Sequence, residues 1–203
     1  TFTKRSRAQL DTVIADDIDD PQIALTCTSG INDMSDMFND QIVNANTSNF
    51  NQNLEHWDVS NVIDMSFMFF DAKSFDQPLN NWDVSNVISM RGLFGGSDFN
   101  VIFNQPIDNW DVSNVTDMAG MFQDNIAFNE SLNNWDVSSV TDMSTMFNTA
   151  TNFDQDLSGW NFNPDVSFGN FLNNTNLTIN NYDSLLQSLD NQGLVDKELG
   201  AIS

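Results

Sequence analysis

The sequence predicts an α/β repeat solenoid in which each coil contributes one short parallel β-strand and one short helix. Three observations lead to this prediction: evenly spaced tryptophans, a series of methionines in phase with them, and a change of hydrophobic period inside each unit. One such unit cannot bury its apolar face alone, so we expect about five or six stacked coils with a helical cap at each end. The tryptophans are Trp57, Trp82, Trp110, Trp135 and Trp160, separated by 25, 28, 25 and 25 residues, and Met65, Met90, Met118 and Met143 each follow a tryptophan by eight.

The strand of each unit is expected at its tryptophan. In Trp82-Asp83-Val84 two apolar residues flank a polar one, which is typical of a short strand with one buried face. Trp and Val then point inward and Asp points outward. We expect successive strands to pair at about 4.8 Å in a parallel sheet.

The helix of each unit is expected directly after the strand. Val87, Met90 and Leu93 lie three residues apart, which favours a helix with one buried stripe. A residue of the N-cap type stands three positions before an acid in several units, for example Asn61 before Asp64. This spacing predicts a capped helix start.

The whole chain, 1–203, is expected to be a single domain. Its repeats occupy 30–172, between an N-terminal cap at 1–29 and a C-terminal cap at 173–203. The apolar period predicts a helix within 6–20 and a closing helix at 182–189. Two insertions, in 40–49 and 95–101, fall at the same place in the repeat, as expected of loops on one edge of a stack.

The net charge excludes several classes of partner. The chain has 29 acidic and 6 basic residues, which give −23 at neutral pH. Nucleic-acid binding depends on Lys and Arg that neutralise phosphates, so we expect no nucleic-acid partner. No apolar run approaches the roughly 18 residues of a membrane-spanning helix, so we expect no membrane insertion by this chain. The oligomeric state stays open.

Candidate ligand-binding residues lie on the predicted outward face of the strands. They form three rows: the residue before each tryptophan, the residue after it, and the residue two positions further on. Stacking of the coils brings each row into register. The candidate site consists of Asn81, Asp83, Ser85, Asn109, Asp111, Ser113, Asn134, Asp136 and Ser138.

The row of aspartates after the tryptophans has two interpretations. Asp58, Asp83, Asp111 and Asp136 are expected within about 5 Å of their neighbours, and such oxygen ligands suit Ca²⁺. Alternatively, each carboxylate accepts hydrogen bonds from the turn that follows it. The spacing matches no EF-hand loop and no glycine-rich calcium repeat, so we favour hydrogen bonding, with calcium as the alternative and no other cofactor.

No combination of residues points to an enzyme. His56 is the only histidine, so neither a Cys–His pair nor a Ser–His–Asp triad forms without it. Gly92, Gly95 and Gly96 lack the lysine of a phosphate-binding loop. The single cysteine, Cys27, excludes an internal disulfide. We predict no catalytic residues.

The repeat unit resembles that of the BspA-like bacterial surface proteins, which are related to leucine-rich repeats. The resemblance rests on Asn109-Trp-Asp-Val-Ser-Asn-Val-Thr-Asp-Met118 and on the matching segment 134–143, and it covers about 30–172. It implies a leucine-rich-repeat-like solenoid that is secreted or displayed on a cell surface. It also implies adhesion or recognition without catalysis.

Two functions are therefore kept in view. The first is a recognition or adhesion module that binds a protein or a glycan through the strand face or through the loops 40–49 and 95–101. The second is a structural spacer within a larger adhesin, stiffened by calcium. Saturable binding of a ligand distinguishes the first from the second.

Overall fold

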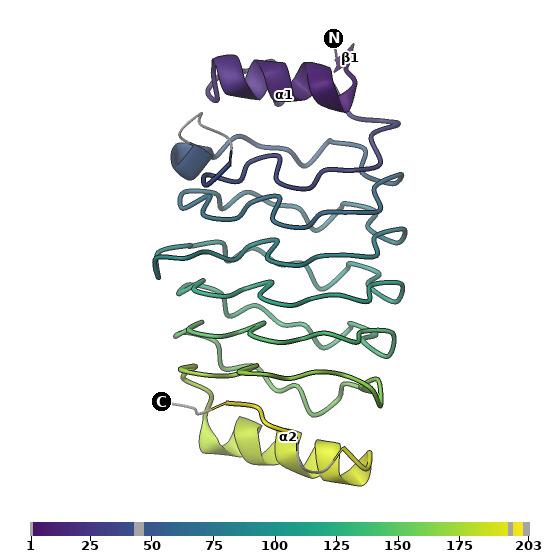
Figure 1. The fold of residues 1–203 in the computed structure, drawn as a ribbon, viewed down its shortest axis with the longest axis vertical. Helices are drawn as coiled ribbons and strands as arrows, with labels where there is room; N and C mark the ends of the chain where they lie inside the picture. The colour runs from purple at the N-terminus through teal and green to yellow at the C-terminus, as the bar shows by residue number, and fades with distance from the viewer. Residues whose placement is uncertain (1, 43–46, 195–196, 201–203) are drawn as a thin grey trace.

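The computed structural model describes residues 2–42, 47–194 and 197–200. Figure 1 shows a stack of flattened layers with a helix across each end. In β1 and β2 the chain pairs in parallel, with Thr3 opposite Thr26 and Lys4 opposite Cys27. The elements in chain order are β1 (Thr3–Lys4), α1 (Arg7–Asp16), β2 (Thr26–Cys27), the short 3-10 helix η1 (Thr47–Asn49) and α2 (Ile179–Asn191).

The prediction of one strand and one helix in every coil is wrong. Within the part of the chain that the structure describes, α1 and α2 are the only α-helices, and β1 with β2 is the only strand pair. The repeats consist of consecutive turns. Isolated parallel bridges join each layer to the next, for example Ser89 to Asp117 and Asp117 to Asp142. Layers of turns thus replace the expected leucine-rich-repeat-like α/β coils.

The backbone around the methionines explains why no helix forms there. Within one layer the Met121 N–H donates to the Met118 carbonyl oxygen at 3.1 Å, which closes a turn, whereas the Phe122 N–H donates to Met146 of the next layer at 2.9 Å. A helix needs consecutive right-handed residues, and a residue at positive φ interrupts it, as in a type II turn. The residue two positions after the first methionine of each layer, or after Phe168 in the last layer, has such a φ: Asp36, Phe67, Gly92, Gly120, Thr145 and Asn170.

The predicted strand is also absent, because the bridges form elsewhere in the layer. They join the residue just before the methionine, as at Asp64 and Ser89, and not the residues around the tryptophan. The expected N-cap at Asn61-x-x-Asp64 therefore has no helix to cap. Instead, Asp64 Oδ1 accepts the Ser66 N–H at 2.8 Å, two residues on.

The inward orientation of the apolar series is confirmed. Trp110 is 2% exposed and Met118 is fully buried. The Trp110 indole Nε1 donates to the Leu79 carbonyl oxygen of the preceding layer at 2.9 Å, so its polar atom is satisfied inside the core. Within one layer Phe94 and Phe103 stack with ring centroids 3.8 Å apart and planes 2° from parallel. Apolar burial and aromatic stacking together hold the layers in register.

The two helices cover the ends of the stack (Figure 1). α1 begins with a capping box in which Ser6 and Gln9 bond each other's backbone N–H groups, and it buries Leu10 and Ile14. α2 buries Leu185 and Leu189. Neither helix is long and apolar enough to cross a membrane, and none is found elsewhere in the described residues.

Candidate functional site

The residues around each tryptophan lie on the surface of the stack. Trp110 and Val112 are buried, and Asp111 between them is exposed. Side chains link the layers on this face, as when Asn114 Nδ2 donates to the Ser85 carbonyl oxygen at 2.8 Å. Of the candidate residues, Asn81, Asp83, Asn109, Asp111, Asn134 and Asp136 are exposed, whereas Ser85, Ser113 and Ser138 are half-buried.

Each aspartate of this face accepts hydrogen bonds from the serine two residues later. Asp111 Oδ1 accepts from the Ser113 N–H at 3.1 Å and from its hydroxyl at 2.6 Å. At the last of these aspartates, hydrogen bonds from the Ser138 hydroxyl and N–H lower the pKa of the Asp136 carboxyl because they favour its charged form. The same Asp-to-Ser contact recurs at Asp58, Asp83 and Asp136.

This geometry agrees with the hydrogen-bonding interpretation of the aspartate row. One oxygen of each carboxylate is committed to closing a turn, as in an Asx turn. Across the described residues, no group of three His, Cys, Asp or Glu side chains is placed to hold a metal ion.

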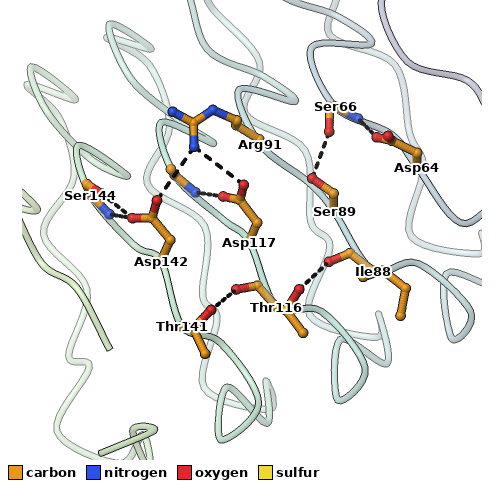
Figure 2. Close-up of polar contacts among 11 residues, drawn as sticks. Asp64, Ser66, Ile88, Ser89, Arg91, Thr116, Asp117, Thr141, Asp142 and Ser144 are labelled. Atoms are coloured by element: carbon orange, nitrogen blue, oxygen red, sulfur yellow. Dashed lines mark hydrogen bonds and ion pairs between the residues drawn. The ribbon is translucent and has the colours of Figure 1, made fainter. Parts of the chain in front are cut away.

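A second row of polar residues stands just before the methionine of each layer, and the sequence did not lead us to expect it as a row. Its members are the bridging residues Asp64, Ser89, Asp117 and Asp142 (Figure 2). The Ser66 and Ser89 hydroxyls lie 2.7 Å apart across two layers. The sequence carried a partial signal, because Asp64 and Asp142 are followed two residues later by Ser, as are the aspartates after the tryptophans.

Arg91 neutralises part of this second row. Its Nη1 lies 3.4 Å from Asp117 Oδ2 and 3.5 Å from Asp142 Oδ2, so one guanidinium spans two layers (Figure 2). Arg91 is about half exposed, so each pair contributes modestly. In the described residues the aspartates after the tryptophans have no such ion pair. The two rows therefore differ in charge: the second carries its own cation, and the first presents uncompensated carboxylates to solvent.

The comparisons with known proteins bear on the repeat. Two segments, 15–102 and 98–184, match the family described as "Mycoplasma protein of unknown function, DUF285". This chain belongs to the DUF285 family. No curated protein and no solved structure matches it. The two matches agree with an internally repeated chain, and the family description assigns no ligand.

The two inserted loops of this DUF285 chain meet at Asp71. From the first loop, Gln41 Nε2 donates to Asp71 Oδ2 at 2.7 Å and contacts the Ser97 hydroxyl at 3.1 Å. From the second loop, the Ser97 N–H donates to Asp71 Oδ1 at 2.8 Å. Residues 43–46 of the first loop lie outside the described residues. The repeat predicted that both loops share one edge of the stack, but it did not predict their contact at Asp71.

The two residues with the most reactive side chains in this DUF285 chain serve the N-terminal end. The His56 ring packs against Phe2, with centroids 4.8 Å apart, and its Nε2 bonds the Ala24 carbonyl oxygen. The Cys27 thiol is half-buried and contacts the Ser29 hydroxyl at 3.3 Å, which lowers the pKa of the thiol. The His56 contacts attach the N-terminal segment to the stack, whereas the Cys27 contact is local.

Proposed function

We propose that this DUF285 chain is a non-enzymatic recognition or adhesion module that binds a protein or a glycan, either secreted or at a cell surface. The resemblance of its repeat to that of the BspA-like surface proteins supports the location and the role. Its family membership is compatible with both.

The observation that carries the proposal is the fixed register of the exposed rows. Each layer bonds to the next through backbone groups, for example Gly120 N–H to the Ser144 carbonyl oxygen at 2.8 Å. Trp110 and the equivalent indoles repeat this link in the core. The backbone positions of exposed residues such as Asn109 and Asn134 are therefore held at constant spacing, so a ligand that contacts several layers does not have to order the backbone.

The rival role, a spacer that binds nothing, makes the opposite prediction. A stack of this kind is stiff whether or not its surface is used. The two roles are distinguished by exposed side chains that the fold does not need. Asn109 and Asn134 are such side chains, because nothing in the described residues bonds their side-chain amides.

The test is a binding screen of the purified chain against immobilised matrix proteins and an array of glycans. We expect saturable binding to at least one of them, weakened about tenfold or more in the double variant Asn109→Ala/Asn134→Ala. Asn191→Ala, at an exposed position at the C-terminal end of α2, is the matched control and should bind as the unaltered chain does. Absence of saturable binding on every surface would favour the spacer.

A further inference from the structure

A polar groove of about 720 Å³ runs along the segments that follow the buried phenylalanines and ends at the start of α2. The residues used below are Asn104, Asn129, Asn152, Asp154, Asn176 and Ile179, all of which line it. Asn104, Asn129 and Asp154 each follow the phenylalanine of their repeat, so the groove is distinct from the rows around the tryptophans.

A ladder of side chains builds one wall of the groove. Asn104 Oδ1 accepts the Asn129 N–H of the next layer at 2.8 Å, and Asn129 Oδ1 accepts the Asp154 N–H at 2.9 Å. Asp154 Oδ1 then accepts the Thr178 N–H at 2.8 Å, next to α2. A backbone N–H can bond only the oxygen of an amide, so the ladder fixes the orientation of both asparagines.

This orientation leaves the nitrogen of each amide free to donate. Among the described residues no acceptor takes the Nδ2 groups of Asn104 and Asn129, and the exposed amides of Asn152 and Asn176 are likewise unbonded. α2 adds the backbone N–H groups of its first turn, which have no partner inside a helix. Its N-cap residue, Thr178, makes no side-chain cap. The groove therefore presents a set of uncharged donors at the repeat spacing.

The chemistry of the lining selects among ligands. The net charge of −23 repels anions, and a row of N–H donors disfavours cations. Sugar hydroxyls both accept and donate, so they match the amide donors and the second oxygen of Asp154. Ile179 is 72% exposed at the end of the groove and offers an apolar surface to a sugar ring. We propose that this groove binds a neutral oligosaccharide whose chain lies along the stack.

This inference goes beyond the proposed recognition surface, because it places an oligosaccharide in a groove separate from the rows around the tryptophans. None of the groove's lining residues is aromatic, so ring stacking contributes nothing. Hydrogen bonds from a few amides then give a Kd on the order of 1 mM for a single copy. Such weak binding becomes effective when many copies engage one glycan-coated surface.

Asparagine-to-aspartate substitutions test the donors without breaking the ladder. Asp76 and Asp154 already occupy ladder positions, and their carboxylate oxygens accept the same N–H bonds. Asn104→Asp and Asn129→Asp thus keep the acceptor and remove the donor. Asn51→Asp is the matched control: Asn51 Oδ1 accepts the Asp76 N–H at 3.0 Å in the same ladder, and Asn51 lies outside the groove. Thermal melting of each variant verifies that it folds.

The measurement is a titration of the ¹⁵N-labelled chain with cellohexaose, maltohexaose and tetra-N-acetylchitotetraose, followed by the side-chain amide resonances of Asn104 and Asn129. We expect saturable shifts with at least one sugar and about 2- to 10-fold weaker binding for each groove variant, because each loses one hydrogen bond. Asn51→Asp should bind normally. Ile179→Ser should weaken binding, and Ile63→Ser, at an isoleucine that is 49% exposed and does not line the groove, should not.

Two results overturn the inference: no sugar moves these amides, or Asn51→Asp weakens binding as much as Asn129→Asp. If a matrix protein nevertheless binds saturably and Asn129→Asp leaves that binding unchanged, the recognition function stands and the oligosaccharide groove fails. If neither sugars nor proteins bind, both proposals fail.

Discussion

The aromatic ring of Phe67 lies against Gly92 of the next layer, where a Cβ on Gly92 would come within 2.4 Å of Phe67 Cδ1. Both residues have positive φ, 56° and 59°. Phe67 adopts this conformation at a cost of about 1–2 kcal/mol, and Gly92 adopts it freely. The pair shows how one layer's side chain depends on its neighbour's backbone.

Gly92→Ala should therefore destabilise the chain more than Gly120→Ala. At Gly120 an added Cβ meets nothing closer than 3.5 Å, so only the left-handed backbone is penalised, by about 1 kcal/mol. At Gly92 displacement of the Phe67 ring adds about 1–3 kcal/mol. Urea unfolding measures both, and Phe67→Ala in the Gly92→Ala background should recover the extra loss. Equal losses at the two glycines would contradict the contact.

Trp110→Phe should destabilise the stack by about 2 kcal/mol. The substitution removes the indole N–H, so the buried Leu79 carbonyl oxygen keeps only the Trp82 N–H as its donor. Trp57→Phe should cost less, because the Trp57 Nε1 to Ile23 oxygen distance is longer, 3.3 Å, at the end of the stack. Denaturant midpoints of the two variants give the comparison; a larger loss at Trp57 would argue against the indole ladder.

Asp124→Asn should stabilise the chain at neutral pH. Burial raises the pKa of the Asp124 carboxyl, aided by the charges of Asp71 and Asp98. Because the folded state binds the proton more tightly than the unfolded state does, protonation of Asp124 stabilises the fold. This stabilisation is fully present below the pKa of the unfolded state and is lost as pH rises through the pKa of the folded state. Asparagine tolerates the positive φ of this position, because Asn174 has a positive φ at the equivalent position of another layer. Thermal melting from pH 3 to 7 should show that Asp124→Asn melts at a higher temperature than the parent, by a difference that grows as pH rises.

Asp136→Asn is a control whose effect on stability should have the opposite sign. Hydrogen bonds from Ser138 depress the pKa of Asp136, so its charged form stabilises the fold above the unfolded pKa and that contribution is lost as pH falls through the folded pKa. The variant should be less stable than the parent at neutral pH and approach it in acid. If both variants shift in the same direction at pH 7, the assignment of these two carboxyls is wrong.

Millimolar Ca²⁺ should not raise the melting temperature beyond what NaCl of equal ionic strength does. Asp58, Asp83 and Asp111 each commit one oxygen to a following serine. Salt alone should stabilise the chain, because it screens the repulsion within a net charge of −23. A calcium-specific rise, reversed by chelator, would revive the spacer stiffened by calcium.

The sequence predicted the core and misassigned the backbone that carries it. The inward Trp110 and Val112 follow directly from alternation. Met118 and Met121 at i and i+3 fit one helical turn, but they fit a single tight turn equally well, and short apolar runs do not separate the two. Gly92, Gly120 and Asn170 stood at one repeat position and indicated a left-handed residue there.

Other parts of the site depended on tertiary neighbours. Gln41 and Ser97 are separated by 56 positions and meet only because two insertions share an edge. The groove needed Ile179 of α2 to be placed against Asn129 and Asp154 of the repeats. No local pattern specifies such contacts.

The most direct test of the layered architecture is a measurement of scalar couplings across hydrogen bonds by NMR. The Phe122 amide nitrogen should couple to the carbonyl carbon of Met146, because its N–H donates to that oxygen at 2.9 Å in the next layer. The Gly120 nitrogen should couple to Ser144 in the same way. A coupling from Phe122 to Met118, four residues earlier, would instead reveal a helix in the repeat and would contradict the stack of turns on which the proposed recognition surface rests.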